Sequence, residues 1–159
     1  MKTRIIIFAI LSVLMLSACS GSKDKKPVTV VGQWELMDIM ETKSVQIGSE
    51  KVEIYIDFKA DKTFELYQQI GEGAHRLYRG TWNLEGTLLT GKYNDGEDWA
   101  SAYHVEMDNG QLILTSNNDA AEKSTYKKSE IPAEVKETCE VVVKSSLRML
   151  NSQPQYRWL

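Results

Sequence analysis

The sequence predicts an all-β domain, an eight-stranded up-and-down antiparallel barrel, with one helix after the last strand. Residues 52–59 alternate apolar and polar side chains, which is typical of a half-buried strand. Similar short segments follow with turn residues and no helical pattern between them, as neighbouring antiparallel strands require. The predicted strands are 30–40, 52–59, 63–70, 75–84, 87–93, 99–107, 111–116 and 122–128.

The N-terminal residues are typical of an export signal that is removed before folding. A basic start and an uncharged apolar run occupy residues 1–18, and this run is shorter than the roughly 20 residues of a membrane-spanning helix. Leu16-Ser17-Ala18-Cys19 resembles the lipobox of bacterial lipoproteins, which implies that Cys19 carries lipid. Residues 19–29 would then be a flexible tether from membrane to barrel. By analogy with known sorting signals, the Ser after Cys19 favours the outer membrane.

Composition restricts the remaining chain to one acidic domain. Residues 1–18 contain two basic and no acidic residues, so the rest of the chain has a net charge of −5. This charge argues against nucleic-acid binding, and no basic and aromatic cluster contradicts it. If Cys19 is lipidated, Cys139 is the only thiol left, and no intrachain disulfide can form.

The pattern Gly-x-Trp-x-Leu occurs at 32–36 and again at 80–84, and the two copies predict a shared end of the barrel. The residues that follow them differ, so the copies are not a repeated unit. The first copy starts strand one and the second ends strand four, and these positions meet at one end of an up-and-down barrel. Short turns at this end predict a closed floor of Trp34, Phe58, Phe64, Trp82 and Leu112.

The periodicity changes to that of a helix only near the end of the sequence. Apolar residues recur at helical spacing between Pro132 and Leu150, and Glu140 and Lys144 are spaced as a favourable ion pair. We expect residues 129–159 to form an amphipathic helix and tail that pack on the outside of the barrel. Cys139 lies on the apolar stripe, where a thiol behaves as a small hydrophobic group.

Several motifs together resemble the lipocalin-like domain of small Gram-negative bacterial lipoproteins. They are the lipobox, GQWEL at 32–36, DFKADKTF at 57–64, YRGTWNLEGTLLT at 78–90 and a closing YKK at 126–128. The resemblance covers about 30–128 and implies a lipocalin-like β-barrel over these residues. Many lipocalins place an Arg over the first-strand Trp, whereas here only Lys127 or Lys128 is available.

The open end of the predicted barrel, rimmed by longer loops, is the candidate ligand site. A barrel of eight strands either holds one small ligand or is filled by its own side chains, and both alternatives remain open. An apolar wall with a few polar groups suits a hydrophobic or amphiphilic guest. The inward candidates near this end are Ile54, Gln68, Ile70, Tyr78, Trp99, Ser101 and Tyr103.

Residues that could bind a metal or catalyse a reaction are isolated in the sequence. The acidic loop 94–98 lacks the ligand spacing of a calcium site and is interpreted as a solvated loop tip. His75 and His104 are interpreted as surface imidazoles, since no metal-ligand spacing surrounds either one. We expect no metal, no cofactor and no enzymatic activity, because no catalytic set of residues is found.

Two hypotheses about function follow. The first is a lipid-anchored binding protein of the cell envelope that holds a small hydrophobic or amphiphilic ligand inside the barrel. The alternative is an envelope interaction protein, such as an inhibitor or an accessory subunit, that uses the barrel as a rigid scaffold. An internal cavity would favour the first hypothesis. A filled barrel with an exposed aromatic patch on the 41–51 or 94–98 loops would favour the second.

Overall fold

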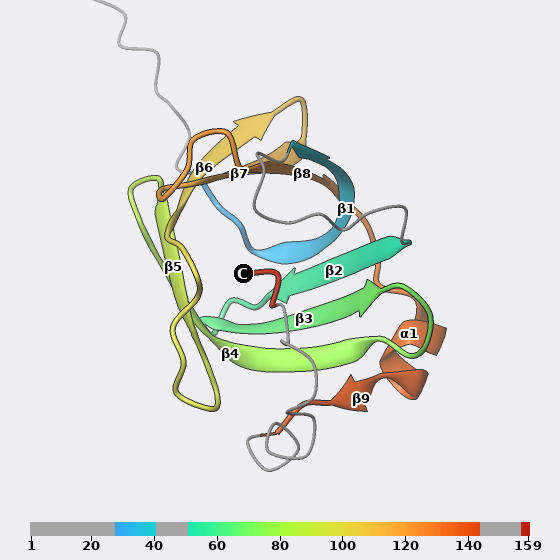
Figure 1. Cartoon of the computed structure of the whole chain (residues 1–159). Helices are drawn as coiled ribbons and strands as arrows, with labels where there is room; N and C mark the ends of the chain where they lie inside the picture. Colours follow the sequence, from blue (N-terminus) through green and yellow to red (C-terminus); the bar gives the residue numbers. More distant parts are fainter. Residues whose placement is uncertain (1–27, 41–50, 144–156) are drawn as a thin grey trace, which may run out of the picture.

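The computed structural model describes residues 28–40, 51–143 and 157–159 (Figure 1). The predicted signal (1–18) and Cys19, with most of the tether, lie outside these residues. None of the described residues forms a helix with the length and hydropathy needed to span a membrane. The elements are β1 (Gly32–Met40), β2 (Val52–Phe58), β3 (Thr63–Ile70), β4 (Arg76–Glu85), β5 (Leu88–Tyr93), β6 (Tyr103–Asp108), β7 (Gln111–Ser116), β8 (Lys123–Lys128), α1 (Ala133–Thr138) and β9 (Glu140–Val141).

Strands β1 to β8 form a closed antiparallel up-and-down barrel, which confirms the predicted fold. Each strand pairs with the next one along the chain, and β8 returns to pair with β1. The ladders differ in length: β2 and β3 pair over seven residues, whereas β5 and β6 pair only through Leu88–His104 and Leu89–Tyr103. Successive short turns therefore bring all eight strands into one sheet without a crossover.

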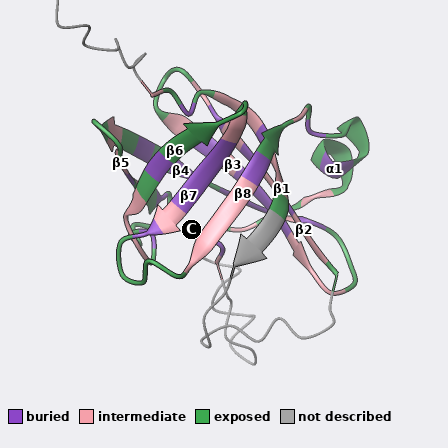
Figure 2. Cartoon of the chain, turned by 90° about the horizontal axis from the view of Figure 1, so that it is seen from above, coloured by how far each residue is buried: buried purple, intermediate pink, exposed green. Residues whose placement is uncertain are grey.

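The barrel interior holds the main hydrophobic core. Alternate residues of the strands face inward, so Ile54, Ile56 and Phe58 of β2 are all buried, while the residues between them are partly exposed. Strand β7 differs, and Figure 2 draws it mainly as buried, since Ile113 is buried as well as its neighbours Leu112 and Leu114. The alternation of buried and partly exposed residues in β2 explains the apolar and polar alternation of residues 52–59, since successive strand side chains point to opposite faces.

The five predicted floor residues lie in one buried cluster. The Phe58 and Trp82 rings meet edge to face with centroids 5.8 Å apart. The buried indoles also have hydrogen-bond partners: Trp34 Nε1 donates to the Val30 carbonyl at 2.7 Å, and Trp82 Nε1 donates to the Thr63 carbonyl at 2.9 Å. Both Trp side chains are thus held in place by packing and by a main-chain acceptor.

Strand β6 begins four residues later than predicted. Residues 99–102 are outside the strand, although Trp99 N still donates to the Gly91 carbonyl at 3.0 Å. The Trp99 ring lies over Gly91, where an added Cβ would come within 2.2 Å of the indole. The indole can pack this closely only because Gly91 has no side chain. Residues 99–102, which include Trp99, are accordingly not part of the regular β5–β6 ladder.

The predicted helix from Pro132 to Leu150 is wrong in its extent. Helix α1 ends at Thr138, Cys139 is extended, and β9 pairs in parallel with Arg76 and Leu77 of β4. Glu140 is therefore in a strand and not in a helical ion pair, while residues 144–150 lie outside the described residues. The β-branched run at 141–143 favours extended structure, and the start of β4 offers an edge that β5 does not cover.

Helix α1 packs on the outer face of the barrel through a small second cluster. Val135 and Ile131 contact Tyr67 and Leu77, and Cys139 is half-buried against the same group. The Cys139 thiol contacts the Lys136 carbonyl, with the sulfur 3.3 Å from the oxygen. Cys139 thus fills part of an apolar contact, as its position on the stripe predicts.

Candidate ligand site inside the barrel

Residues 157–159 lie inside the barrel. The C-terminus of the sequence is marked within the ring of strands in Figure 1, and Trp158 and Leu159 belong to the same buried cluster as the inner strand residues. Only 8% of Trp158 and 1% of Leu159 are exposed. We therefore correct the prediction that the described end of this tail packs on the outside of the barrel.

Three inward-facing strand residues form hydrogen bonds with this segment. The Gln68 side-chain oxygen accepts from the Trp158 main-chain N–H at 3.0 Å. The Tyr126 hydroxyl accepts from the Trp158 indole at 2.6 Å, and the Tyr93 hydroxyl donates to the main-chain oxygen of Leu159 at 2.7 Å. Strands β3, β5 and β8 each supply one partner, so the polar groups converge from around the barrel. The interior thus combines an apolar wall with matched donors and acceptors.

Burial keeps the Tyr93 hydroxyl in its neutral form. Desolvation raises the pKa of Tyr93 above the usual value for a tyrosine, because the phenolate would lose its hydration inside the barrel. The positive charge of Arg157 opposes this shift without cancelling it. The hydroxyl therefore remains a hydrogen-bond donor over the physiological pH range.

Arg157 holds the outer end of the segment. Its guanidinium pairs with the Asp95 carboxylate and lies 4.7 Å from the Tyr93 ring centroid and 5.7 Å from that of Tyr78. Partial burial disfavours the charge, but the Asp95 contact outweighs it and raises the pKa of Arg157. Arg157 also lines a cleft of about 230 Å³ with Tyr78, Tyr93 and Asp95. The acidic loop is thus engaged at Asp95, and the interpretation of that residue as part of a solvated loop tip is wrong.

The structure brings some of the seven predicted candidates to this site. Ile54, Gln68 and Tyr78 are buried in the interior, and Gln68 contacts the segment directly. Tyr103 is half-buried against the core, and Ile70 is half-buried at the end of β3. These positions agree with inward-facing residues, while their contact with a ligand stays a prediction.

Trp99 lies elsewhere than predicted. Its ring contacts Phe64 at a centroid distance of 5.2 Å and Phe58 at 6.3 Å, so it packs among residues that we assigned to the floor. It contacts Tyr103 on the other side, at 6.2 Å. Within the described part of the chain, Trp99 Nε1 has no hydrogen-bond partner although it is buried. The predicted separation of Trp99 at the mouth from the floor aromatics is therefore wrong.

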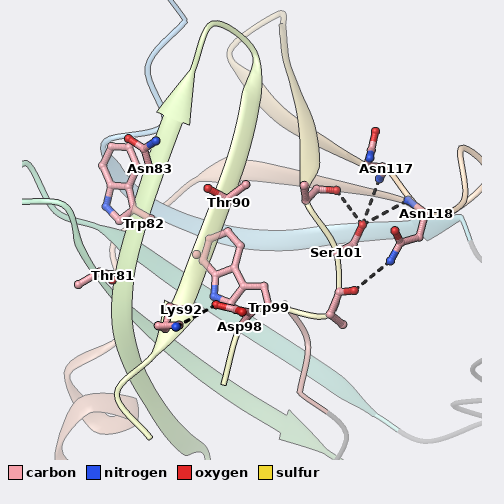
Figure 3. A pocket seen from close by; sticks show the side chains of 13 residues that line it. Thr81, Trp82, Asn83, Thr90, Lys92, Asp98, Trp99, Ser101, Asn117 and Asn118 are labelled. Atoms are coloured by element: carbon pink, nitrogen blue, oxygen red, sulfur yellow. Dashed lines mark hydrogen bonds and ion pairs between the residues drawn. The ribbon is translucent and has the colours of Figure 1, made fainter. Parts of the chain in front are cut away.

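Ser101 connects two loops rather than facing the seated segment. Its hydroxyl oxygen lies 2.9 Å from that of Ser116 and accepts from the main-chain N–H groups of Asn117 and Asn118 (Figure 3). These contacts lie at one side of a groove of about 510 Å³, which Trp99 also lines. Ser101 thus positions the loop after β7, a role that the alternation pattern did not indicate.

The two histidines differ in their surroundings. His104 is exposed, as interpreted, whereas His75 is only 7% exposed and the surface interpretation is wrong for it. His75 Nε2 lies 3.4 Å from the Glu53 carboxylate, and its ring lies 5.9 Å from that of Tyr55. Burial lowers the pKa of His75, and the charge of Glu53 opposes this shift. Among the described residues no group of three or more metal-ligating side chains comes together.

Lys128 lies over the first-strand Trp. Its ammonium nitrogen is 5.6 Å from the Trp34 ring centroid, whereas Lys127 pairs with Glu35. Of the two lysines that the sequence offered, Lys128 thus takes the position that an arginine occupies in many lipocalins. This cation–π contact is made with a ring that is itself almost fully buried.

Four parts of the site were not predicted from the sequence, namely Tyr93, Tyr126, Asp95 and residues 157–159. Tyr93 continues the inward-facing series of Leu89 and Gly91, so strict alternation along β5 could have placed it inside. Tyr126 is likewise the single buried residue of the closing YKK. A three-residue segment has no periodicity, so nothing in the pattern indicated that residues 157–159 enter the barrel.

The closed barrel with convergent polar groups inside it defines a scaffold of the kind that binds small ligands. Comparison with known families agrees, since residues 30–114 match the family model described as the lipocalin-like domain. This match covers more than half of the chain, and the protein belongs to the lipocalin-like domain family. No curated protein matches the chain.

Proposed function

We propose that this protein binds a small hydrophobic or amphiphilic molecule inside its barrel, at the cell envelope. The observation that carries the proposal is the way the interior holds Trp158 and Leu159. An indole and an aliphatic side chain fit within the core, and each polar atom named above has a partner there. A barrel that accommodates these groups would have room for a guest of similar size and polarity once the segment is displaced.

The positions of the polar groups indicate the chemistry of the guest. Its apolar body would take the place of the Trp158 and Leu159 side chains. A donor on the guest would meet the Gln68 side-chain oxygen or the Tyr126 hydroxyl, and an acceptor would meet the Tyr93 hydroxyl. A purely aliphatic guest would not replace the hydrogen bonds that these groups make with residues 158–159, and each buried hydrogen bond lost costs about 1–3 kcal/mol. An amphiphile is therefore favoured over a hydrocarbon.

The location of the protein is proposed from its N-terminal sequence. Lipid on Cys19 would anchor the chain, and residues 20–29 would connect the anchor to β1. The residue after Cys19 is Ser20, which favours the outer membrane. This placement would put the barrel next to a source of amphiphilic molecules.

The alternative of an interaction protein receives less support. The filled interior is compatible with it, but the large hydrophobic residues that are exposed in the described ranges include no aromatic side chain. They are Val31, Met37, Met107, Val141 and Val143. A docking surface rich in aromatics is therefore not found on the described loops.

Native mass spectrometry of the protein purified from its own membrane tests the proposal. We expect a small-molecule adduct that is lost when the protein is unfolded. Tyr126→Phe should lower the adduct occupancy because it removes an inward hydroxyl, while Tyr55→Phe, on the outer face, should not. The proposal fails if no adduct appears and if neither fatty acids nor lysophospholipids bind the purified protein.

A further inference from the structure

We infer that the barrel interior is a binding site that the chain's own residues 157–159 occupy as an intramolecular ligand, through one basic, one aromatic and one aliphatic side chain. In this inference the segment comes out of the barrel to admit a guest, so segment and guest compete for one site. The inference rests on the proposed ligand-binding function. It adds that the ligand-free protein is already occupied by part of itself.

The contacts of the segment are those of a bound ligand rather than of a strand. Residues 157–159 belong to no element of the sheet, and the main chain of Trp158 and of Leu159 forms hydrogen bonds with the Gln68 and Tyr93 side chains of the barrel. The four polar partners come from four separate places, namely β3, β5, β8 and the loop after β5. Such convergence on a short peptide is a feature of a recognition site.

The barrel wall is complete without the segment. All eight strands pair with their neighbours, and the ladder of β3 and β4 closes the ring. Residues 157–159 contribute no strand pairing to this closure, and they follow β8 by nearly thirty residues. Withdrawal of the segment would therefore break side-chain packing and the polar contacts named above, while every ladder of the ring remains formed.

Withdrawal would also create the site that the proposed function requires. The space left by Trp158 and Leu159 is bordered by core residues, and the side chains of Gln68, Tyr93 and Tyr126 would lose the hydrogen bonds described above. Loss of these buried hydrogen bonds is unfavourable, so a guest that replaces them would be favoured over one that does not. The same groups would thus recognise both occupants.

A tethered occupant lowers the apparent affinity for a guest by a factor equal to the fraction of time in which the site is empty. If the segment is seated about 99% of the time, the apparent affinity for a guest falls about 100-fold. Guests that match the polar groups poorly would fail to displace it. The segment would then act as a selectivity filter, because only a guest that replaces both its apolar and its polar contacts competes well.

The experiment compares probe binding to three forms of the full chain. The probe is the fluorescent fatty acid 11-(dansylamino)undecanoic acid. The forms are the unchanged protein, a variant that lacks residues 157–159, and Asp95→Asn, a milder change that weakens the Arg157 anchor and keeps the apolar contacts. Asp98→Asn is the matched control, since Asp98 lies in the same loop but pairs with exposed Lys92.

Deletion should tighten probe binding at least 10-fold, Asp95→Asn should have a smaller effect in the same direction, and Asp98→Asn should have none. A synthetic peptide of residues 152–159 should displace the probe from the deletion variant, whereas the same peptide with Trp158→Ala should not. If the deletion variant does not fold, the Asp95→Asn comparison decides. The inference is overturned if the deletion variant binds the probe no more tightly than the unchanged protein. Where the deletion variant does not fold, equal affinity of Asp95→Asn and the unchanged protein overturns it. Either result leaves the proposed function standing. Absence of probe binding in every form would overturn the inference, and the proposed function would fail with it if no native adduct appears and lysophospholipids also do not bind.

Discussion

Replacing Gly91 by Ala should destabilise the barrel because of Trp99 alone. An ideal Cβ on Gly91 lies 2.2 Å from Trp99 Cε2 and 2.3 Å from Cζ2, far inside van der Waals contact. The backbone of Gly91 does not have a positive φ, so Ala fits its conformation. Without the indole, Ala would be neutral or slightly stabilising in a strand. With it, overpacking should cost about 1–3 kcal/mol.

A double-mutant cycle isolates this contact. Trp99→Ala alone should cost about 3–5 kcal/mol, as expected for a large buried aromatic side chain. In that background the Gly91→Ala cost should disappear, which gives a coupling energy of about 1–3 kcal/mol. Urea unfolding followed by circular dichroism measures the four free energies of unfolding. Trp99→Leu replaces Trp99→Ala if the latter is too unstable to measure.

Gly80→Ala is the control for this cycle. Its added Cβ would meet the Lys92 main-chain oxygen at 2.0 Å, and loss of Trp99 cannot remove a backbone atom. Its cost should therefore persist in the Trp99→Ala background. If Gly91→Ala costs the same with and without the indole, Trp99 does not lie over Gly91, and the correction that moves Trp99 from the mouth to the floor is wrong.

Three further predictions concern other parts of the chain. Cys19→Ala should abolish acyl labelling and release the protein from the membrane fraction; unchanged labelling would disprove the lipoprotein assignment. Trp34→Ala and Trp82→Ala should each cost about 3–5 kcal/mol in urea unfolding, since both indoles are buried and hydrogen-bonded, and near-wild-type stability would contradict their place in the core. Because burial lowers the pKa of His75, the unfolded chain takes up its proton first, and stability should fall as pH drops from about 6.5 towards the folded-state pKa. His75→Gln should reduce this slope in melting temperature and His104→Gln should not; equal slopes would refute the burial of His75.

Most of the fold could be predicted because strand alternation is a local signal. Residues 52–58 show this, since each inward position of β2 is apolar and its burial follows directly. The shared end of the two Trp motifs followed from counting strands, and the two residues belong to one cluster. Family resemblance added the same fold independently.

The rest depended on contacts between distant residues. Helix α1 stops early because the edge of β4 competes for residues 140–141, and no local pattern reports such an edge. The pair of Arg157 and Asp95 joins residues 62 positions apart. Trp99 was misplaced because its strand was extended to residue 99, whereas the size of the indole and the space above Gly91 determine its position.

The ladder of β5 and β6 is short, so it forms a weakly paired seam in the otherwise continuous sheet of the barrel. Only two residue pairs join these strands, and they are Leu88–His104 and Leu89–Tyr103. Opening this seam would expose two strand edges while seven of the eight ladders of the ring remain intact. The amide of Tyr103 and its neighbours in the seam should therefore exchange with solvent sooner than those of β2 and β3. We therefore expect the barrel to open locally between β5 and β6 before it unfolds as a whole.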